Sequence, residues 1–478
     1  MTWVLTGVAR RAQDHFLELR LDFLLDVARG VLDLLVVAHC LAQHLADLGQ
    51  PGRPEHDKGD HDKDHQLCWS HSEHVNLSFI GTARRYYHTT LAGLSLRRDK
   101  GGAQSDTMVG TSKGVQMFLL SESESNQWSE LARHALEDGP AGPRDHAFVV
   151  APTMRAAFFY YVGGLFAAAG LVSDARRWLE AGRDIEPIPA CACLLDVLDR
   201  HGDTLVIPEV IFSDPRPWGH FAGLPTLRTA RENFLRIATD SLPHFEEPLR
   251  LIDVGCGSGE LGVRLMRSLI EAGKVGRVGA VALIDPSAGM LEAAGRNVAE
   301  AFPGAEIRLI QSRLEDAGAL GERYDVALAS SSVHHMPAEL KAEHLGALSG
   351  SIDHFLLSEL EANHDYPEQS SPELAFSAYQ IFGRGIQWIF TEDAPDEVRR
   401  ACADTFLMTE AISILTRPRG ERTEYHMLRG QWRALLDLVM RGFCCVCDST
   451  CYADEYVEQF MVHYAREAPP ASRYSITS

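Results

Sequence analysis

The sequence predicts an α/β protein in which a mostly parallel sheet, covered by helices on both faces, follows a helical domain. Between residues 249 and 359, five short apolar runs alternate with amphipathic stretches, as happens where crossover helices bury parallel strands. On either side, at 115–245 and 360–420, apolar residues recur at helical spacing. With 478 residues, the chain has room for roughly two to four domains.

Composition and charge exclude several classes of protein. A hydrophobic content of 45% and a charged content of 23% are typical of a soluble globular protein. The formal net charge of −21 argues against a nucleic-acid partner, because no basic excess is present to neutralise phosphates. Residues 31–48 are too polar to span a bilayer, and no secretory leader is recognised. With ten cysteines and no sign of a disulfide framework, we expect a cytoplasmic protein without a membrane partner.

Residues 1–107 differ from the rest of the chain. Nine of the 21 histidines fall here, and 53–74 is a low-complexity tract of His, Asp and Lys. Such a tract can bind metal. A disordered extension, or a start assigned too early with Met108 or Met117 as the true beginning, accounts for the composition equally, and one of these two is our expectation.

A helical N-terminal domain is predicted over 108–245. Its clearest part is 154–183, which predicts two helices joined at Gly170 and Leu171. The pair is reminiscent of one tetratricopeptide unit, but no second copy follows, and repeat arrays need at least about three units. A plain helical domain is therefore expected.

The strands of the sheet are predicted at the apolar runs rich in β-branched residues. The first five are 249–255, 279–286, 306–312, 324–332 and 353–360. A helical insertion then occupies 360–420, and a helix predicted over 423–442 ends at Gly442. Two further strands, 443–450 and 458–465, complete the sheet.

The turn after the first strand carries the spacing Asp253-x-Gly255-x-Gly257-x-Gly259. With Gly262, its last two glycines also satisfy the G-x-G-x-x-G pattern of dinucleotide-binding proteins, which is weak evidence alone. However, a carboxylate at Asp253 would repel a pyrophosphate, whereas it suits a ligand that carries an ammonium group. The next strand ends at Asp285, a position from which an acid can accept hydrogen bonds from ribose hydroxyls.

Three motifs, "DVGCGSG" (253–259), "ALIDPSAGML" (282–291) and "DVALASSSVHHM" (325–336), resemble those of class I S-adenosylmethionine-dependent methyltransferases. The resemblance covers 246–359 and 421–467. It implies a Rossmann-like seven-stranded methyltransferase sheet whose last strand runs antiparallel, with S-adenosyl-L-methionine as the cofactor.

The resemblance also implies which residues bind the cofactor. Asp253 and the glycine turn would line its methionine end, and Asp285 would hold the ribose. Arg313 stands where an Asp is common in the family, so the adenine contact passes to Leu314 and Glu315. The implied set is Asp253, Gly255, Cys256, Gly257, Gly259, Asp285, Pro286, Leu314, Glu315 and Ser330.

Catalytic candidates are expected at the carboxyl ends of the strands, where open α/β sheets bind ligands. A sulfonium methyl is already activated, so the protein mainly aligns a nucleophile and excludes water, and a base helps if the acceptor carries a proton. His335 after the fourth strand and Glu359 and His364 after the fifth are the candidates. The group 359–365 can be interpreted as a base, a metal-binding set, a substrate-orienting set or a solvated loop; no metal site is predicted.

Four thiols lie close together at Cys444, Cys445, Cys447 and Cys451. A structural zinc site usually needs two C-x₂₋₄-C pairs, whereas neighbours on a strand point to opposite faces, and Cys451 is expected after a turn. Buried, inert thiols are therefore predicted; a soft-metal or arsenite site is the alternative.

Together these observations predict a methyltransferase that transfers a methyl group to an O, N or C atom of a small-molecule acceptor, with 360–420 as a helical lid. The alternatives are an NAD(P)-dependent oxidoreductase, an inactive cofactor-binding scaffold and a thiol-dependent arsenic methyltransferase.

Overall fold

The computed structural model describes residues 119–467 except 138–144, 146, 209–214 and 315–320. The predictions for 1–107 and for Glu315 lie outside the described residues.

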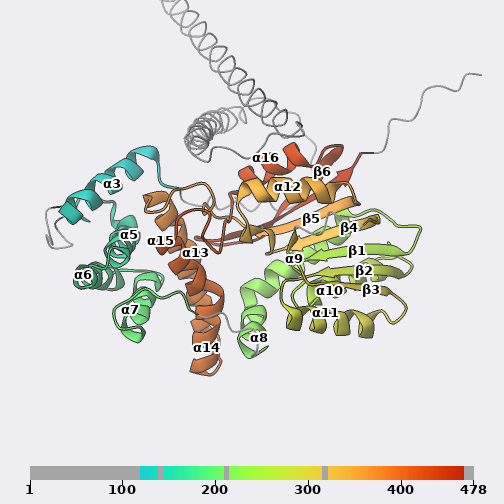
Figure 1. Cartoon of the computed structure of the whole chain (residues 1–478), viewed down its shortest axis with the longest axis horizontal. Coiled ribbons are helices and arrows are strands. Elements are labelled where there is room, and N and C mark those ends of the chain that lie inside the picture. Colours follow the sequence, from blue (N-terminus) through green and yellow to red (C-terminus); the bar gives the residue numbers. More distant parts are fainter. Residues whose placement is uncertain (1–118, 138–144, 146, 209–214, 315–320, 468–478) are drawn as a thin grey trace, which may run out of the picture. The chain divides into compact units, whose positions relative to one another are not determined.

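A seven-stranded sheet lies at the centre of the C-terminal half (Figure 1). Its strands are β1 Leu249–Val254, β2 Val278–Ile284, β3 Glu306–Ile310, β4 Tyr324–Ser330, β5 Ile352–Leu360, β6 Phe443–Ala453 and β7 Glu458–Arg466. They lie in the order β3-β2-β1-β4-β5-β7-β6. The first five pair in parallel, and β7 is antiparallel to β5 and β6. Every strand overlaps its predicted run, and the Rossmann-like methyltransferase sheet is confirmed.

Helices cover both faces of the sheet. On one face lie α9 (Pro225–Ser241), α10 (Glu260–Glu271) and α11 (Ala288–Ala301), and on the other lie α12 (Ala338–Ser349) and α16 (Arg429–Val439) (Figure 1). Successive side chains of β1 point to opposite faces of the sheet. Leu251 belongs to the apolar cluster beside α9, α10 and α11, and Ile252 belongs to the cluster beside α12 and α16. Both are fully buried, and burying such a side chain stabilises a fold by about 1.5–3 kcal/mol.

The part of the chain before the sheet is helical where it is described. It contains α3 Glu122–Glu137, the short 3₁₀ helix η1 Pro152–Met154, α5 Arg155–Ala168, α6 Val172–Arg183, α7 Ala190–Arg200 and α8 Pro215–Gly223. The predicted helix pair at 154–183 is confirmed as α5 and α6, and Gly170 between them adopts a left-handed backbone with φ 74°. A Cβ on Gly163 would lie 2.7 Å from Leu179 Cγ, so this glycine lets the two helices approach.

The insertion after β5 packs against these helices. It contains α13 Pro372–Thr391, α14 Asp396–Ala403, a π-helical turn η4 Asp404–Met408 and α15 Thr409–Thr416. Aromatic rings join the two parts: Trp128 on α3 lies 5.8 Å from Phe376 on α13, and Tyr160 on α5 lies 5.7 Å from Tyr379, as measured between ring centroids. One apolar core therefore includes helices that precede β1 and helices that follow β5 in the sequence.

Two predictions are corrected by the structure. The helix predicted over 423–442 begins only at Arg429, because the segment 421–428 has no regular structure and pairs with distant loops. Tyr425 donates its backbone N–H to the carbonyl of His334 at 2.6 Å. Cys451 does not follow a turn but lies inside β6, where a register shift interrupts the pairing with β7. Among the described residues, no helix is long and apolar enough to cross a membrane.

Candidate functional site

The glycine turn, residues 255–259, joins β1 to α10. Gly255, Gly257 and Gly259 have φ values of 65°, 51° and 72°, a region that side-chain-bearing residues rarely adopt. A Cβ on Gly255 would lie 2.3 Å from the Cβ of Ser332, whereas one on Gly257 would meet nothing within 4 Å. Gly255 is therefore required for packing, and Gly257 keeps backbone next to open space where a ligand can approach.

Two carboxylates stand beside this turn in different environments. Asp285, just after β2, accepts hydrogen bonds from the backbone N–H of Gly257 at 2.9 Å and of Ser287 at 2.8 Å. Asp253 on β1 is 4% exposed; no hydrogen bond to its carboxylate is found within the described chain. Burial, together with the charge of Asp285, raises the pKa of Asp253 to about 7. The site thus contains a carboxylate that a cationic group would stabilise in its charged form.

The other residues predicted to bind the cofactor lie at different depths. Cys256 is 9% exposed within the turn, and burial raises the pKa of its thiol well above the usual range. Pro286 is exposed beside Asp285. Leu314 is buried in the apolar cluster on the α12 and α16 face of the sheet. Ser330 ends β4, where it pairs with Ser358 of β5.

The loop after β4 connects the glycine turn with β5. Ser331 has a left-handed backbone with φ 49°, a strained conformation of a kind that is common at functional sites. The hydroxyl of Ser332 donates to the carbonyl of Val254 at 2.8 Å. The backbone N–H groups of Ser332 and Val333 both donate to Oε1 of Glu359 at 3.2 Å. Glu359 therefore fixes this loop against Gly255 and acts, in this structure, as a positioning residue.

The three predicted catalytic residues are reached by solvent to different extents. Glu359 and His364 are fully buried, whereas His335 is exposed. Burial lowers the pKa of His364 to about 3. The pKa of His335 is also lowered to about 3, because surrounding protein desolvates its ring and the charge of His334 adds to this effect. A lowered pKa makes both imidazoles weaker proton acceptors than an ordinary histidine; their catalytic roles stay predictions.

Three residues that were not predicted complete this region. Glu410 lies on α15, and Glu424 and His426 lie in the segment before α16. Oε2 of Glu359 lies 2.7 Å from Nδ1 of His334 and 3.7 Å from Nδ1 of His426. Burial raises the pKa of Glu410 to about 7 and lowers that of His426 well below its usual range. No local sequence pattern predicts these residues, because only the tertiary fold brings their segments close to β4 and β5.

The cysteines of β6 take no part in this region. The prediction of four buried thiols holds only for Cys451: Cys445 and Cys447 are half-buried and Cys444 is exposed, because they lie on β6, the edge strand of the sheet. Where the chain is described, none of the donor groups that could hold a metal ion includes a cysteine. Burial raises the pKa of Cys451 to about 12, which keeps its thiol protonated.

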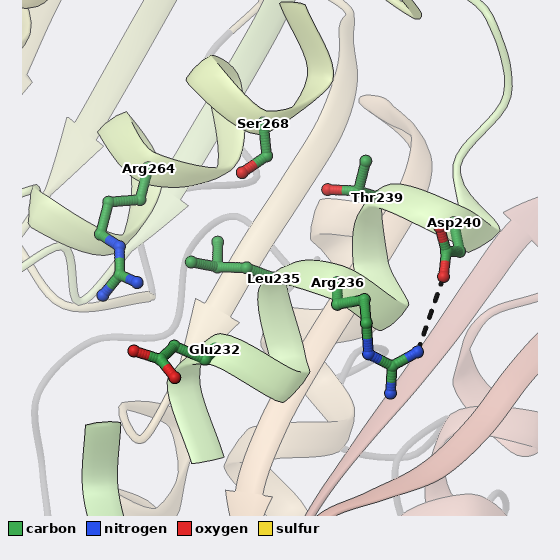
Figure 2. Close-up of a pocket in the computed structure, with 7 residues that line it drawn as sticks. All are labelled: Glu232, Leu235, Arg236, Thr239, Asp240, Arg264 and Ser268. Carbon is green, nitrogen blue, oxygen red and sulfur yellow. Dashed lines mark ion pairs between the residues drawn. The ribbon is translucent and has the colours of Figure 1, made fainter. Parts of the chain in front are cut away.

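A surface hollow lies between α9 and α10, as Figure 2 shows. Arg236 and Asp240, both on α9, form an ion pair at 3.7 Å along its rim. The side chains that line it are Glu232, Leu235, Arg236, Thr239, Asp240, Arg264 and Ser268. None of them belongs to the glycine turn or to the strand ends, so the hollow is separate from the candidate site.

Residues 251–350 match the model of a methyltransferase domain family. The match begins in β1, includes the glycine turn, Asp285 and the loop after β4, and ends just before β5. No curated protein matches the chain.

Solved structures with a similar fold include three examples at low identity. The magnesium protoporphyrin IX methyltransferase of Synechocystis with bound SAM is 15% identical, with 58% of this chain and 96% of that chain covered and a TM-score of 0.31. The Burkholderia thailandensis 1,6-didemethyltoxoflavin-N1-methyltransferase is 13% identical, with 54% and 86% covered and a TM-score of 0.32. SCL7 of Oryza sativa is 13% identical, with 71% and 98% covered and a TM-score of 0.46. Because these TM-scores are low, the class of the protein is argued from the family match and from the strand order of the sheet.

The chain has the seven-stranded Rossmann-like methyltransferase fold, with β7 antiparallel to its neighbours. Within it, residues 251–350 are similar to a methyltransferase domain. The sheet is completed by β6 and β7, which lie beyond the matched residues, after the helical insertion.

Proposed function

We propose that the protein is an S-adenosyl-L-methionine-dependent methyltransferase whose acceptor is a small molecule. The observation that carries this proposal is the pair of carboxylates at the glycine turn, with Asp285 bonded to the N–H of Gly257 and Asp253 buried without a hydrogen-bond partner in the described chain. Asp253 suits the ammonium group at the methionine end of the cofactor, and Asp285 suits its ribose.

The residues present fit this cofactor. Gly257 offers backbone beside open space. Burial and the charge of Asp285 raise the pKa of Asp253, and no cationic side chain of the described residues offsets them. Bound S-adenosylmethionine supplies a methyl group on a sulfonium, whose leaving group is a neutral thioether. A dinucleotide would instead place its pyrophosphate against this carboxylate pair, so the oxidoreductase alternative is disfavoured by like-charge repulsion.

The chain's own contribution is to position the acceptor and to exclude water. Glu359 holds the loop after β4 through two backbone N–H groups, and that loop carries His334 and His335 to the ends of β4 and β5. The proposed acceptor is small because a net charge of −21 disfavours nucleic acid. The atom that is methylated, O, N or C, is left open in this proposal.

The test is incubation of the full chain with methyl-labelled S-adenosylmethionine and a metabolite extract, followed by identification of the labelled product by mass. We expect a labelled small molecule whose yield, at a cofactor concentration below saturation, is lower with Asp285→Ala than with the wild type. Calorimetry with S-adenosylhomocysteine and with NAD complements this test. Heat with NAD but none with S-adenosylhomocysteine would overturn the proposal, and cofactor binding without any labelled product would favour the inactive scaffold.

A further inference from the structure

Six ionisable side chains from four parts of the chain converge at the ends of β4 and β5. His334 and His335 lie in the 3₁₀ turn η3 (Val333–His335), and Glu359 lies on β5. The histidine–glutamate cluster consists of His334, His335, Glu359, Glu410, Glu424 and His426. Its members form three overlapping triplets, within each of which the possible ligand atoms all lie within 4.8 Å of one another.

The buried half of the cluster is tightly packed. The rings of His334 and His426 stack with centroids 3.9 Å apart. Both of their Nδ1 atoms lie near the same oxygen, Oε2 of Glu359, at 2.7 and 3.7 Å. On the other side of His426, Nε2 contacts Oε1 of Glu424. Two imidazoles thus lie between two buried carboxylates.

Several of these buried polar atoms have no adequate partner. Glu424 is fully buried, with an exposed fraction of 0%, and the exposed fraction of His426 is 5%. Neither carboxylate oxygen of Glu424 makes a hydrogen bond of acceptable geometry in the described chain, and neither does Nδ1 of His426. A buried carboxylate without hydrogen bonds or a counter-charge is costly.

The nearby cations are already engaged elsewhere. The ammonium of Lys341 donates to Oδ2 of Asp365 at 3.1 Å and to the carbonyl of Tyr425. Arg422 donates to the carbonyls of His364 and Pro367. The carboxylates of the cluster therefore lack a hydrogen-bonded cation from the protein among the described residues, and a cation from solution would supply the missing charge.

We propose that the histidine–glutamate cluster binds a divalent first-row transition-metal ion. His334, His426 and Glu359 supply the ligand atoms, which lie within 4.8 Å of one another. Glu424, in contact with Nε2 of His426, orients that imidazole, and His335 stands on the exposed side. Imidazole nitrogen favours Zn²⁺, Fe²⁺ and related ions, and two histidines with a carboxylate are a frequent ligand set for them. Mg²⁺ and Ca²⁺ prefer oxygen-only sites, so this donor set disfavours them.

The position of the site suggests what such an ion would bind. Ser332, whose N–H is held by Glu359, lies against Gly255, so the cluster is coupled to the glycine turn through one loop. His335 leaves one side of the cluster open to solvent. Resting on the proposed function, we infer that the ion holds an oxygen or nitrogen donor of the acceptor, which makes the acceptor a molecule able to ligate a metal.

The test measures metal binding apart from catalysis, with the full chain. Metal content is measured on protein purified without chelator, and Zn²⁺ affinity is measured by competition with a chromophoric chelator after stripping. We expect about one tightly bound ion per chain and at least roughly tenfold weaker Zn²⁺ binding in His426→Gln and Glu424→Gln. Stripping should lower the melting temperature of the wild type but not of these variants.

His354→Gln is the matched control, because His354 is a half-buried histidine on β5 that pairs with His463 at 3.0 Å, away from the cluster. It should bind Zn²⁺ like the wild type. A wild type that binds neither Zn²⁺, Fe²⁺ nor Mn²⁺, or cluster variants that bind Zn²⁺ unchanged, would overturn the metal site. Calorimetry with S-adenosylhomocysteine on the same samples separates the two proposals: cofactor binding without metal binding refutes only this inference, and metal binding without cofactor binding refutes only the proposed function.

Discussion

The glycine turn and the histidine–glutamate cluster stabilise their buried carboxylates in different ways. At the turn, Asp285 accepts hydrogen bonds from two backbone N–H groups, and in the cluster Glu359 likewise accepts from two. Asp253 and Glu424, by contrast, are buried without such donors in the described chain. Each region therefore pairs one carboxylate that is satisfied by the fold with one that is not.

The difference separates carboxylates whose charge the fold already stabilises from those whose charge only a bound cation would stabilise. A carboxylate bonded to backbone N–H groups fixes a loop whether or not anything is bound. A buried carboxylate without donors is destabilising until a cation arrives, and the two regions point to two cations: the ammonium of the cofactor at Asp253 and a metal ion at Glu424. Substitutions at the turn and, as a contrast, on β6 test this comparison, from the largest expected effect to the smallest.

The largest effect is expected from Asp253→Asn. The pKa of Asp253 is raised to about 7 in the native state, so between pH about 4 and about 7 the native state holds more protons than the unfolded state. The free energy of unfolding should therefore fall as the pH rises through this window, by on the order of 4 kcal/mol for a three-unit shift. Urea unfolding at a series of pH values should show a fall that is smaller in Asp253→Asn than in the wild type by this amount, because other groups with a raised pKa, such as Glu410, titrate in both proteins.

Asp240→Asn, at an exposed position on α9, is the control for that series and should keep the wild-type pH dependence. Asp285→Asn should reduce the fall in the free energy of unfolding with pH, because the charge of Asp285 contributes to the raised pKa of Asp253. A pH dependence in Asp253→Asn equal to that of the wild type would remove the basis for an unsatisfied carboxylate at the turn.

The next effect compares two glycines of the turn. Both have positive φ, so Gly255→Ala and Gly257→Ala share a backbone strain of about 1–2 kcal/mol. Only Gly255→Ala adds a clash with Ser332, which should lower its free energy of unfolding by a further 1–3 kcal/mol or so. Urea unfolding of the two variants measures the difference, and equal stabilities would contradict the packing role of Gly255.

A smaller effect is expected on cofactor affinity. Asp285→Ala should weaken binding of S-adenosylhomocysteine by about 1–3 kcal/mol, the range for hydrogen bonds to a charged group. Isothermal titration calorimetry measures it, with circular dichroism to confirm that the variant is folded. An affinity equal to that of the wild type would contradict the assignment of Asp285 to the ribose.

The smallest effect is expected on β6. The double variant Cys445→Ser, Cys447→Ser should change the free energy of unfolding by no more than about 0.5–1 kcal/mol, because both side chains are half-buried. Its metal content and methyl transfer should equal those of the wild type. Loss of methyl transfer in this variant would instead support the thiol-dependent alternative.

The sheet and the glycine turn could be predicted because their signals are local. Each strand is a short apolar run between turn residues, and the turn lies within seven consecutive residues, 253–259. The helix prediction is wrong over 423–428 for the opposite reason. The backbone bonds of this segment go to His334, His364 and Asp365, between about 60 and 90 residues away, and these contacts override a local helical pattern. Glu424 and His426 were missed with it.

The apolar core that α3 and α5 share with α13 also has a consequence for how the protein is made. More than 200 residues separate Trp128 from its ring partner Phe376, so the first helices leave the ribosome long before the insertion exists. At about 5–20 residues per second, their apolar faces stay uncovered for roughly ten seconds or more. We therefore expect a truncation that ends before α13 to aggregate rather than fold, which light scattering of the purified fragment would measure.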